Sequence, residues 1–277
     1  MKLFPTLLSI LFLAFAGCDK PVDRAATPRP RIVTFSPALT TMVFDMGLGD
    51  HVVGVSEYAL PPNGRAIPVV GDTRNVRTEP ILAVEPDVLL TQSELKHYET
   101  VKQFLPELKV ERLPLTTLAE VAAAMERIGV LVDQPELGRA TAEAFRRRLD
   151  AVKDKTKNLP RRRVMFVMDY QNPFAAGGAT FLDEMIRLAG GVNVLAGTRD
   201  WHKPAVENVL AARPDVIVCQ CKPAQAREAK RYWEELLAKV NPQVRVYAVT
   251  DDTWTIAAGH LAKHTEELAK MIHPELR

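Results

Sequence analysis

The 277-residue sequence lacks the charge asymmetry and the long apolar segments that mark several protein classes. Its 36 basic and 34 acidic side chains leave a formal net charge of +2, whereas a nucleic-acid-binding protein normally gathers a basic excess on one face. After the first residues, no apolar run approaches the roughly 20 residues of a membrane span. With 47% hydrophobic and 25% charged residues, the composition is that of a soluble globular protein.

Motifs that carry catalysis are also missing. The sequence has no GxGxxG after a predicted strand, and no GxSxG, GxxxxGK[ST] or HExxH. Metal-cluster enzymes built from similar folds need several cysteines between two lobes, and this chain has only three cysteines, of which Cys219 and Cys221 fall in one lobe. We therefore predict a protein that is not an enzyme and that needs no resident cofactor.

The N-terminus carries an export signal. Lys2, an apolar run over residues 7–15 and the small residues before Cys18 predict a signal peptide at residues 1–17. Residues 15–18, Phe-Ala-Gly-Cys, resemble a bacterial lipobox, which implies that Cys18 is lipidated after cleavage. A plain secretory signal with an incidental Cys18 is the alternative.

Residues 18–30 are rich in proline and charge and predict a flexible tether between the lipid and the folded protein. Asp19 directly follows the cysteine, and by resemblance to Gram-negative lipoproteins this implies retention at the inner membrane. We expect a protein on the periplasmic face of that membrane, with a soluble periplasmic protein as the alternative.

The remaining chain predicts two α/β lobes, at residues 31–115 and 159–277. In the first lobe, short apolar runs alternate with helical patterns, which predicts a parallel sheet. The second lobe repeats this order. Glu79 and Glu207 each stand seven residues before a Pro-Asp dipeptide that opens a predicted strand, a shared pattern that indicates an internal repeat.

Residues 116–158 connect the lobes through two amphipathic helical patterns, whose apolar residues recur at steps of three or four. A helix over residues 135–155 would be about 30 Å long. We expect this helix to act as a stiff connector that limits hinge closure.

Several segments together resemble the periplasmic substrate-binding proteins of iron-siderophore and vitamin B12 importers, and the resemblance covers nearly everything after residue 30. It implies two Rossmann-like α/β lobes joined by a long helix, a metal chelate held in the cleft between them, and delivery to an ABC transporter permease. We expect a monomer. The segments that carry the resemblance are residues 31–41, 47–56, 68–72, 79–87 and 178–185.

The predicted binding residues follow the strands, because ligands of open parallel sheets bind at the carboxyl ends of the strands. Aromatic rings with a few polar groups suit a large, flat, partly apolar ligand better than a sugar or a single ion. For any one aromatic residue, core or rim packing is the alternative. By the resemblance, Tyr58 and Trp201 match cleft positions. The predicted ligand-binding residues are Pro37, Tyr58, Gln92, Tyr170, Phe174, Trp201, Asp252 and Trp254.

The ligand is expected to be a corrinoid such as vitamin B12, with a ferric siderophore or haem as the alternative. Some siderophore-binding proteins use an arginine cluster, and the loop candidates here are only Arg74, Arg77 and Arg199. Residues 251–255 resemble the acidic-aromatic loop of B12-binding proteins, although Ile256 stands near where an arginine often follows. A direct Zn²⁺ or Mn²⁺ receptor would need three or four converging histidines and carboxylates, and the six histidines are mostly elsewhere.

Three further groups of residues have alternative interpretations. Cys219 and Cys221 lie two apart in a strand, where a disulfide needs a local turn, so they are a disulfide, a contact to metal or corrin, or two partly buried thiols. His260 and His264, with Glu267, have a spacing that can hold a metal, but a solvated helix face is expected. His202 is either a rim or axial ligand or a surface group.

Glu79 and Glu207 are predicted to dock the permease. By the resemblance, glutamates at these motif positions meet arginine pockets on the two permease subunits. The helix macrodipole also favours a carboxylate at a helix start, which accounts for one such glutamate more easily than for a matched pair. We expect both to lie on lobe tips, on the side of the cleft mouth.

Overall fold

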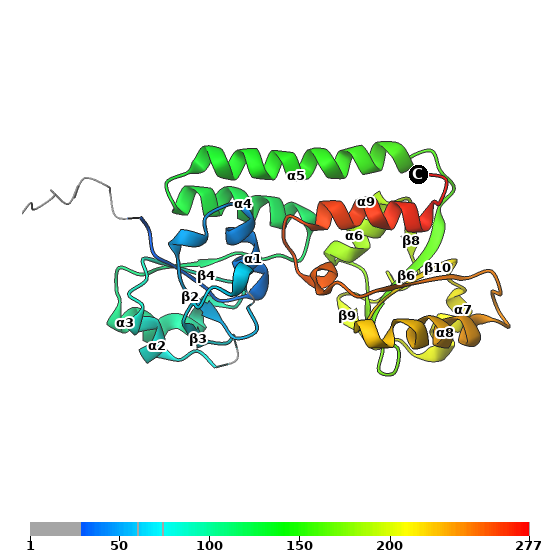
Figure 1. Cartoon of the computed structure of the whole chain (residues 1–277), viewed down its shortest axis with the longest axis horizontal. Coiled ribbons are helices and arrows are strands. Elements are labelled where there is room, and N and C mark those ends of the chain that lie inside the picture. Colours follow the sequence, from blue (N-terminus) through cyan, green and yellow to red (C-terminus); the bar gives the residue numbers. More distant parts are fainter. Residues whose placement is uncertain (1–28, 60, 74, 277) are drawn as a thin grey trace, which may run out of the picture.

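The computed structural model describes residues 29–59, 61–73 and 75–276. They form two α/β lobes with a long helix running over both (Figure 1), which confirms the predicted fold class. The predicted signal peptide and Cys18 lie outside the described residues. Within the described ranges, no helix is both long and apolar enough to span a bilayer.

The N-terminal lobe contains a five-stranded sheet in the order β3-β2-β1-β4-β5, with every neighbouring pair parallel. This agrees with the parallel sheet predicted from the alternating pattern. Strands β3 and β5 were not predicted, because they are short and lack a long apolar run. The strands are β1 (Ile32–Thr34), β2 (Val52–Ser56), β3 (Val69–Gly71), β4 (Val88–Thr91) and β5 (Lys109–Arg112).

The first helix of this lobe starts directly at the carboxyl end of β1. Ser36 is its N-cap, with its side chain accepting from the Leu39 amide at 3.4 Å, and Pro37 occupies the first turn. Gly47 follows the helix with φ of 75°, the left-handed conformation that glycine adopts without strain. The helices of the lobe are α1 (Pro37–Asp45), α2 (Thr78–Ala83) and α3 (Glu99–Phe104).

The C-terminal lobe has a mixed sheet in the order β11-β10-β6-β7-β9, with β8 beside β6. The second lobe does not repeat the parallel sheet of the first throughout, because β7 and β9 are antiparallel to their neighbours. After β6 the chain turns straight back, so no crossover helix separates β6 from β7. The strands are β6 (Arg162–Met168), β7 (Phe174–Ala176), β8 (Gly191–Asn193), β9 (Trp201–His202), β10 (Val216–Gln220) and β11 (Arg245–Val249).

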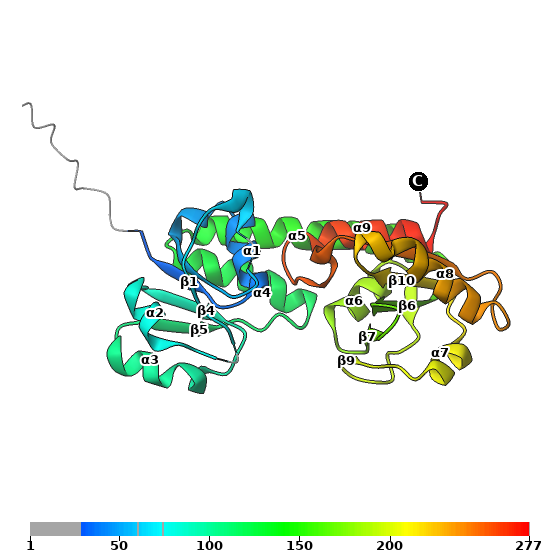
Figure 2. The same cartoon turned by 60° about the horizontal axis from the view of Figure 1, so that its bottom comes forward.

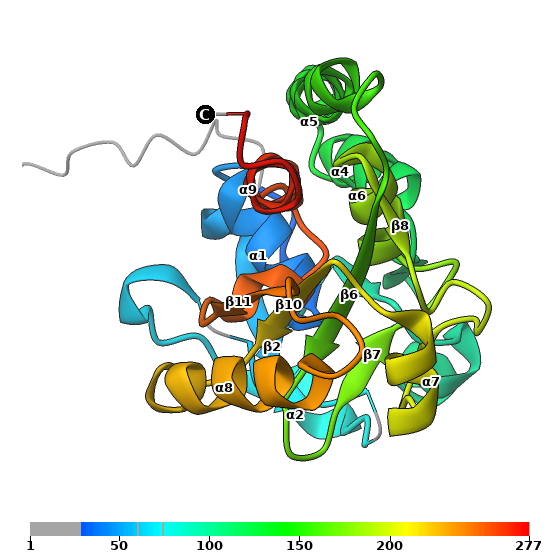
Figure 3. The same ribbon diagram turned by 90° about the vertical axis from the view of Figure 1, so that its right-hand side faces the viewer.

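Helices cover both faces of this sheet (Figure 3). Along β6, Val164 and Phe166 enter the core shared with α6 and α9, whereas Met165 and Val167 enter a second core under α7 and α8. This alternation follows from the period of two in a strand. The helices of the lobe are α6 (Phe181–Leu188), α7 (Val206–Ala212), α8 (Ala226–Leu237) and α9 (Leu261–Ile272).

Helices α4 (Leu118–Leu131) and α5 (Pro135–Thr156) connect the lobes. Helix α5 packs on α4 at one end and on α6 and α9 toward the other (Figures 1 and 3). The α4–α5 contact is close, because a Cβ added at Gly129 would lie 2.7 Å from the Gly138 Cα. One apolar core runs from β1 through α4 to β6 and α9, so the lobes share an interior.

Candidate functional site

A cavity of about 450 Å³ opens at the carboxyl edge of the N-terminal sheet. Its lining residues close or follow strands β1 to β4, where ligands of open parallel sheets bind. Three predicted binding residues, Pro37, Tyr58 and Gln92, are among them. We call the strand-end surfaces on the facing sides of the two lobes the interlobe face. The lining residues are Phe35, Ser36, Pro37, Ser56, Glu57, Tyr58, Asp72, Thr73, Gln92 and Ser93.

Among the residues that the structure describes, Tyr58 is the most exposed large hydrophobic residue, with 72% of its surface accessible. Its φ of 66° is left-handed, which is uncommon for a non-glycine residue and often marks a functional position. The turn is closed by the Ala59 amide, which donates to the Ser56 carbonyl at 3.2 Å. The chain therefore holds an aromatic ring out at the edge of the cavity.

Polar groups with unused hydrogen-bonding capacity lie on both lobes. Within the described residues, the buried Ser56 Oγ and Gln220 Oε1 atoms have no hydrogen-bond partner. Ser56 ends β2 and lines the 450 Å³ cavity, and Gln220 ends β10. A ligand that donates or accepts at these atoms would satisfy them, which buried polar groups normally require.

Two predicted aromatic residues of the C-terminal lobe stack on the interlobe face. The rings of Phe174 and Trp201 have centroids 5.8 Å apart and an interplanar angle of 14°. Phe174 is 39% exposed and Trp201 is half-buried. Figures 1 and 2 place β9, which carries Trp201, on the side that faces the N-terminal lobe. The predicted residue Asp252 is exposed just after β11, and Gln220 Nε2 lies 3.5 Å from its Oδ1.

Tyr170 and Trp254, also predicted to bind ligand, are instead buried in the interior, at 4% and 2% exposure. Tyr170 follows Asp169, whose φ of 59° turns the chain, and its ring packs 5.7 Å from that of Tyr232 in α8. Trp254 stacks on the Phe166 ring at 6.1 Å. These two rings therefore pack in the core of the C-terminal lobe, beneath its part of the interlobe face.

His260 and His264 are structural residues, so the expected solvated helix face is wrong. His264 is 2% exposed, with Nδ1 3.0 Å from Glu267 Oε2 and Nε2 2.8 Å from Thr253 Oγ1. His260 Nε2 donates toward the carbonyls of Thr253 and Ile256 at 2.8 Å. The two imidazoles hold the loop after β11 against α9. The described residues include no group of three or more metal-ligating side chains placed to hold an ion.

Cys219 and Cys221 are free, buried thiols. Cys219 lies in β10, between β6 and β11, and Cys221 directly follows the end of that strand, where no turn brings the two into a disulfide. Burial raises the pKa of Cys219 to about 12, so it stays protonated and is a poor metal ligand.

His202 follows Trp201 in β9, and successive strand residues point to opposite faces. Its Nδ1 lies over Gly177, 3.1 Å from where a Cβ would be. The His202 side chain therefore packs against the backbone at Gly177, on the face of β9 opposite the stacked rings of Phe174 and Trp201.

The two predicted docking glutamates stand at equivalent places in the lobes. Glu79 is in the first turn of α2 and Glu207 in the first turn of α7, and both are exposed. Figures 1 and 2 show α2 and α7 on the side of the molecule opposite α5. One partner contacting that side would therefore meet both lobes.

Comparison with known proteins identifies the family of this fold. Residues 32–244 match the family model described as periplasmic binding protein. The chain belongs to this family. A periplasmic binding protein acts outside the cytoplasm, which confirms the predicted periplasmic location.

Relatives of this periplasmic binding protein cover almost all of it. It is 24% identical over 279 residues to a vitamin B12-binding protein of Yersinia pseudotuberculosis, spanning 98% of this chain and 95% of the relative. The periplasmic haem-binding protein RhuT of Roseiflexus sp. RS-1 matches with a TM-score of 0.74 and 22% identity, over 90% of this chain and 100% of that one. The periplasmic vitamin B12-binding protein BtuF of Vibrio cholerae matches with a TM-score of 0.74 and 22% identity, over 88% and 97%. At these identities the solved structures establish the fold.

Proposed function

We propose that the protein captures a corrinoid, a cobalt-containing macrocycle of the vitamin B12 type, between its lobes and delivers it to an ABC permease without performing any chemistry. The observation that carries the proposal is the character of the interlobe face. Three accessible aromatic side chains, Tyr58, Phe174 and Trp201, lie there together with the polar side chains of Ser56, Glu57, Gln220 and Asp252. Such rings suit a broad, partly apolar ligand, and the curated relative named above is a B12-binding protein.

The polar groups favour a ligand with neutral amides over an anion. A corrin carries amide side chains that can donate and accept hydrogen bonds, as the free Ser56 Oγ and Gln220 Oε1 atoms require. Glu57 and Asp252 place negative charge on opposite lobes. A trianionic ferric siderophore would be repelled there, and we therefore rank it below a corrinoid.

Haem is the second candidate, and Tyr58 is the observation that favours it. A tyrosine oxygen can ligate haem iron, and this ring is 72% exposed at the cavity edge. Haem-binding proteins also share the fold. Against haem stand its two propionates, which would face the acidic residues of the interlobe face.

Titration of the purified protein with cyanocobalamin, hemin and a panel of ferric siderophores, followed by calorimetry and absorption, tests the proposal. We expect one cyanocobalamin per chain, with affinity changed less than about threefold by Tyr58→Phe, since that substitution keeps the ring. Hemin binding tighter than cyanocobalamin, with an absorption spectrum that changes in Tyr58→Phe, would establish the haem alternative. Failure of both ligands to bind would refute the corrinoid and haem assignments together.

The proposal includes a lipid anchor at Cys18 on the periplasmic face of the inner membrane, and docking of a monomer through Glu79 and Glu207. Mass spectrometry of the protein purified from membranes tests the anchor. We expect a chain that begins at Cys18 and carries acyl groups, and Cys18→Ser should release the protein into the soluble periplasmic fraction.

A further inference from the structure

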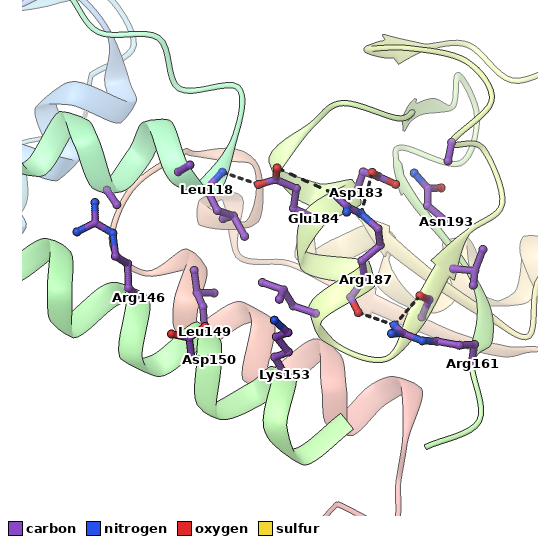
Figure 4. A pocket seen from close by; sticks show the side chains of 16 residues that line it. Leu118, Arg146, Leu149, Asp150, Lys153, Arg161, Asp183, Glu184, Arg187 and Asn193 are labelled. Atoms are coloured by element: carbon purple, nitrogen blue, oxygen red, sulfur yellow. Dashed lines mark hydrogen bonds and ion pairs between the residues drawn. The ribbon is translucent and has the colours of Figure 1, made fainter. Parts of the chain in front are cut away.

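A cavity of about 830 Å³ lies beneath α5, between α4, α6 and β8 (Figure 4). Its volume falls within the range of roughly 300–1,000 Å³ that is usual for small-molecule sites. It shares no lining residue with the 450 Å³ cavity of the interlobe face. The two cavities are therefore separate sites.

Part of the apolar wall of this cavity is accessible. Val192 is 49% exposed in β8 although it is apolar, and Ala119 is exposed at the start of α4. Covering such surface is favourable by the hydrophobic effect. The apolar lining residues are Leu118, Ala119, Ala122, Leu149, Leu188, Val192 and Ala196.

Two of the four basic residues around the cavity are neutralised by carboxylates. Arg146 Nη1 lies 2.6 Å from Glu126 Oε1. Arg187 Nε lies 3.3 Å from Asp183 Oδ2, and its Nη2 lies 3.9 Å from Glu184 Oε1. These pairs leave little charge for a ligand.

Lys153 and Arg161, the other two, form no ion pair with any described carboxylate. Arg161 Nη1 donates only to backbone carbonyls, of Arg187 at 2.7 Å and Gly191 at 3.4 Å. Figure 4 shows Lys153 extending from α5 toward the apolar side chains. The one other lining carboxylate, Asp150, forms no ion pair with a basic residue in the described part of the chain. The end of the cavity lined by Lys153, Arg161 and Asp150 thus carries two positive charges and one negative charge.

The helix macrodipole favours a lysine in the last turn of α5, and this accounts for Lys153 alone. It does not account for Arg161, which precedes β6 and lines the same cavity. An apolar wall with uncompensated positive charge at one end matches a molecule with an apolar body and one anionic end.

We propose that this cavity binds an anionic amphiphile, with its alkyl or acyl chain along the apolar wall and its carboxylate or phosphate group at Lys153 and Arg161. The cavity spans the connection between the lobes. At its wall, the Leu118 amide of α4 donates to Glu184 Oε2 of α6 at 2.7 Å. A ligand seated there contacts α4, α5 and α6 together, so it stabilises the folded chain and raises its melting temperature.

Calorimetric titration of the full-length protein with dodecanoate, kept below its micellar concentration, tests the proposal. We expect one dodecanoate per chain, and Lys153→Met should weaken its binding about fivefold to tenfold because a charge-assisted contact is lost. Lys155→Met, two residues along the same helix and off the cavity wall, is the matched control and should leave binding unchanged. Asp150→Asn should tighten binding about twofold by removing a like charge.

A second variant separates occupancy of this cavity from other effects. Ala119→Trp places a bulky ring at an exposed position of the wall and should abolish dodecanoate binding, whereas Trp201→Ala, on the interlobe face, should not change it. A parallel titration with a single-chain lysophosphatidate identifies whether a phosphate head group or a carboxylate binds better, and 1:1 binding of either that depends on Lys153 supports the proposal. Equal binding of dodecyltrimethylammonium, loss of binding in Trp201→Ala, or no response to Lys153→Met and Ala119→Trp overturns it.

Discussion

The edge of the Phe166 ring meets the Trp201 ring, with centroids 6.3 Å apart and an interplanar angle of 83°. On its exposed side Trp201 stacks on Phe174. On the buried side Phe166 stacks on Trp254, whose ring lies 4.5 Å from that of His264. A continuous series of ring contacts therefore leads from the interlobe face into the core, and it fixes the position of Trp201.

Because Trp201 is held in place by these contacts, its ring is a preorganised ligand contact. We expect Trp201→Ala to weaken cyanocobalamin binding by about 1 to 3 kcal/mol, the range for an aromatic anchor, measured by calorimetry. Trp201→Phe keeps a ring against Phe166 and Phe174 and should lose less. Unchanged affinity in Trp201→Ala would remove this residue from the binding site.

The stiffness of helix α5 is expected to limit how far the two lobes can rotate relative to each other. Helix α5 is one continuous helix, and α9 of the C-terminal lobe is tied to it by Arg148 Nε, which donates to Glu266 Oε1 at 3.0 Å. Bending α5 would break backbone hydrogen bonds that contribute about 0.5 to 1.5 kcal/mol each. Crystal structures without ligand and with cyanocobalamin should therefore superpose with only a small rotation between the lobes. A hinge closure of roughly tens of degrees would show that α5 is not a stiff connector.

His260 lies at the contact between the lobes and makes stability depend on pH. Its Nδ1 is 4.0 Å from Asp45 Oδ2 at the end of α1. Burial lowers the pKa of His260 from 6.5, while hydrogen bonds to Ile256 and Thr253 act in the opposite direction. The folded state therefore binds fewer protons at this site than the unfolded chain, so the contribution is present above pH 6.5 and is lost as the pH falls through the folded-state pKa.

We expect the free energy of unfolding, measured with urea, to fall between pH 7.5 and 5.5, and to fall less in His260→Gln. Burial raises the pKa of Asp45 from 3.8, so the folded state binds more protons at that carboxyl than the unfolded chain, and this contribution to the slope has the opposite sign. The exposed His97, changed to Gln, is the control and should keep the wild-type pH dependence. Identical slopes for wild type and His260→Gln would show that His260 does not cause the pH dependence.

The sequence predicted the architecture wherever one element had a long, regular pattern. Residues 135–155 were expected as a helix, and α5 spans Pro135–Thr156, because its apolar residues repeat over several turns. Strands β7 and β9 were missed because they have only three and two residues, too few to show a period. Their antiparallel pairing depends on contacts made across the folded lobe, which no local pattern encodes.

Burial within the candidate site was harder to predict than position. Tyr58 and Tyr170 both follow strands, yet one is 72% and the other 4% exposed. The two exposures differ because the Tyr58 ring points away from the protein after its turn, whereas the Tyr170 ring packs under α8. His264 is buried for a similar reason, since the face of α9 that carries it packs against Trp254. Such tertiary contacts are invisible in the spacing of residues along the chain.

The internal repeat leads to the last prediction, since Glu79 and Glu207 begin equivalent helices in the two lobes. Both residues are exposed, and the helices that carry them, α2 and α7, lie on the side opposite α5 (Figure 2). If they meet guanidinium groups on the two permease subunits, they govern orientation and encounter rate more than ligand affinity.

We expect the double substitution Glu79→Ala with Glu207→Ala to leave cyanocobalamin affinity unchanged but to slow ligand-stimulated transport in vesicles reconstituted with the permease. The loss should be greater than in either single variant, because each carboxylate orients one lobe, and it should shrink as salt screens the wild-type contacts. Glu99→Ala, an exposed glutamate in the first turn of α3, is the matched control and should transport normally. If the double variant transports at the wild-type rate across a range of salt concentrations, the docking role is refuted. The two glutamates are then explained by the helix macrodipole, which favours a carboxylate at a helix start.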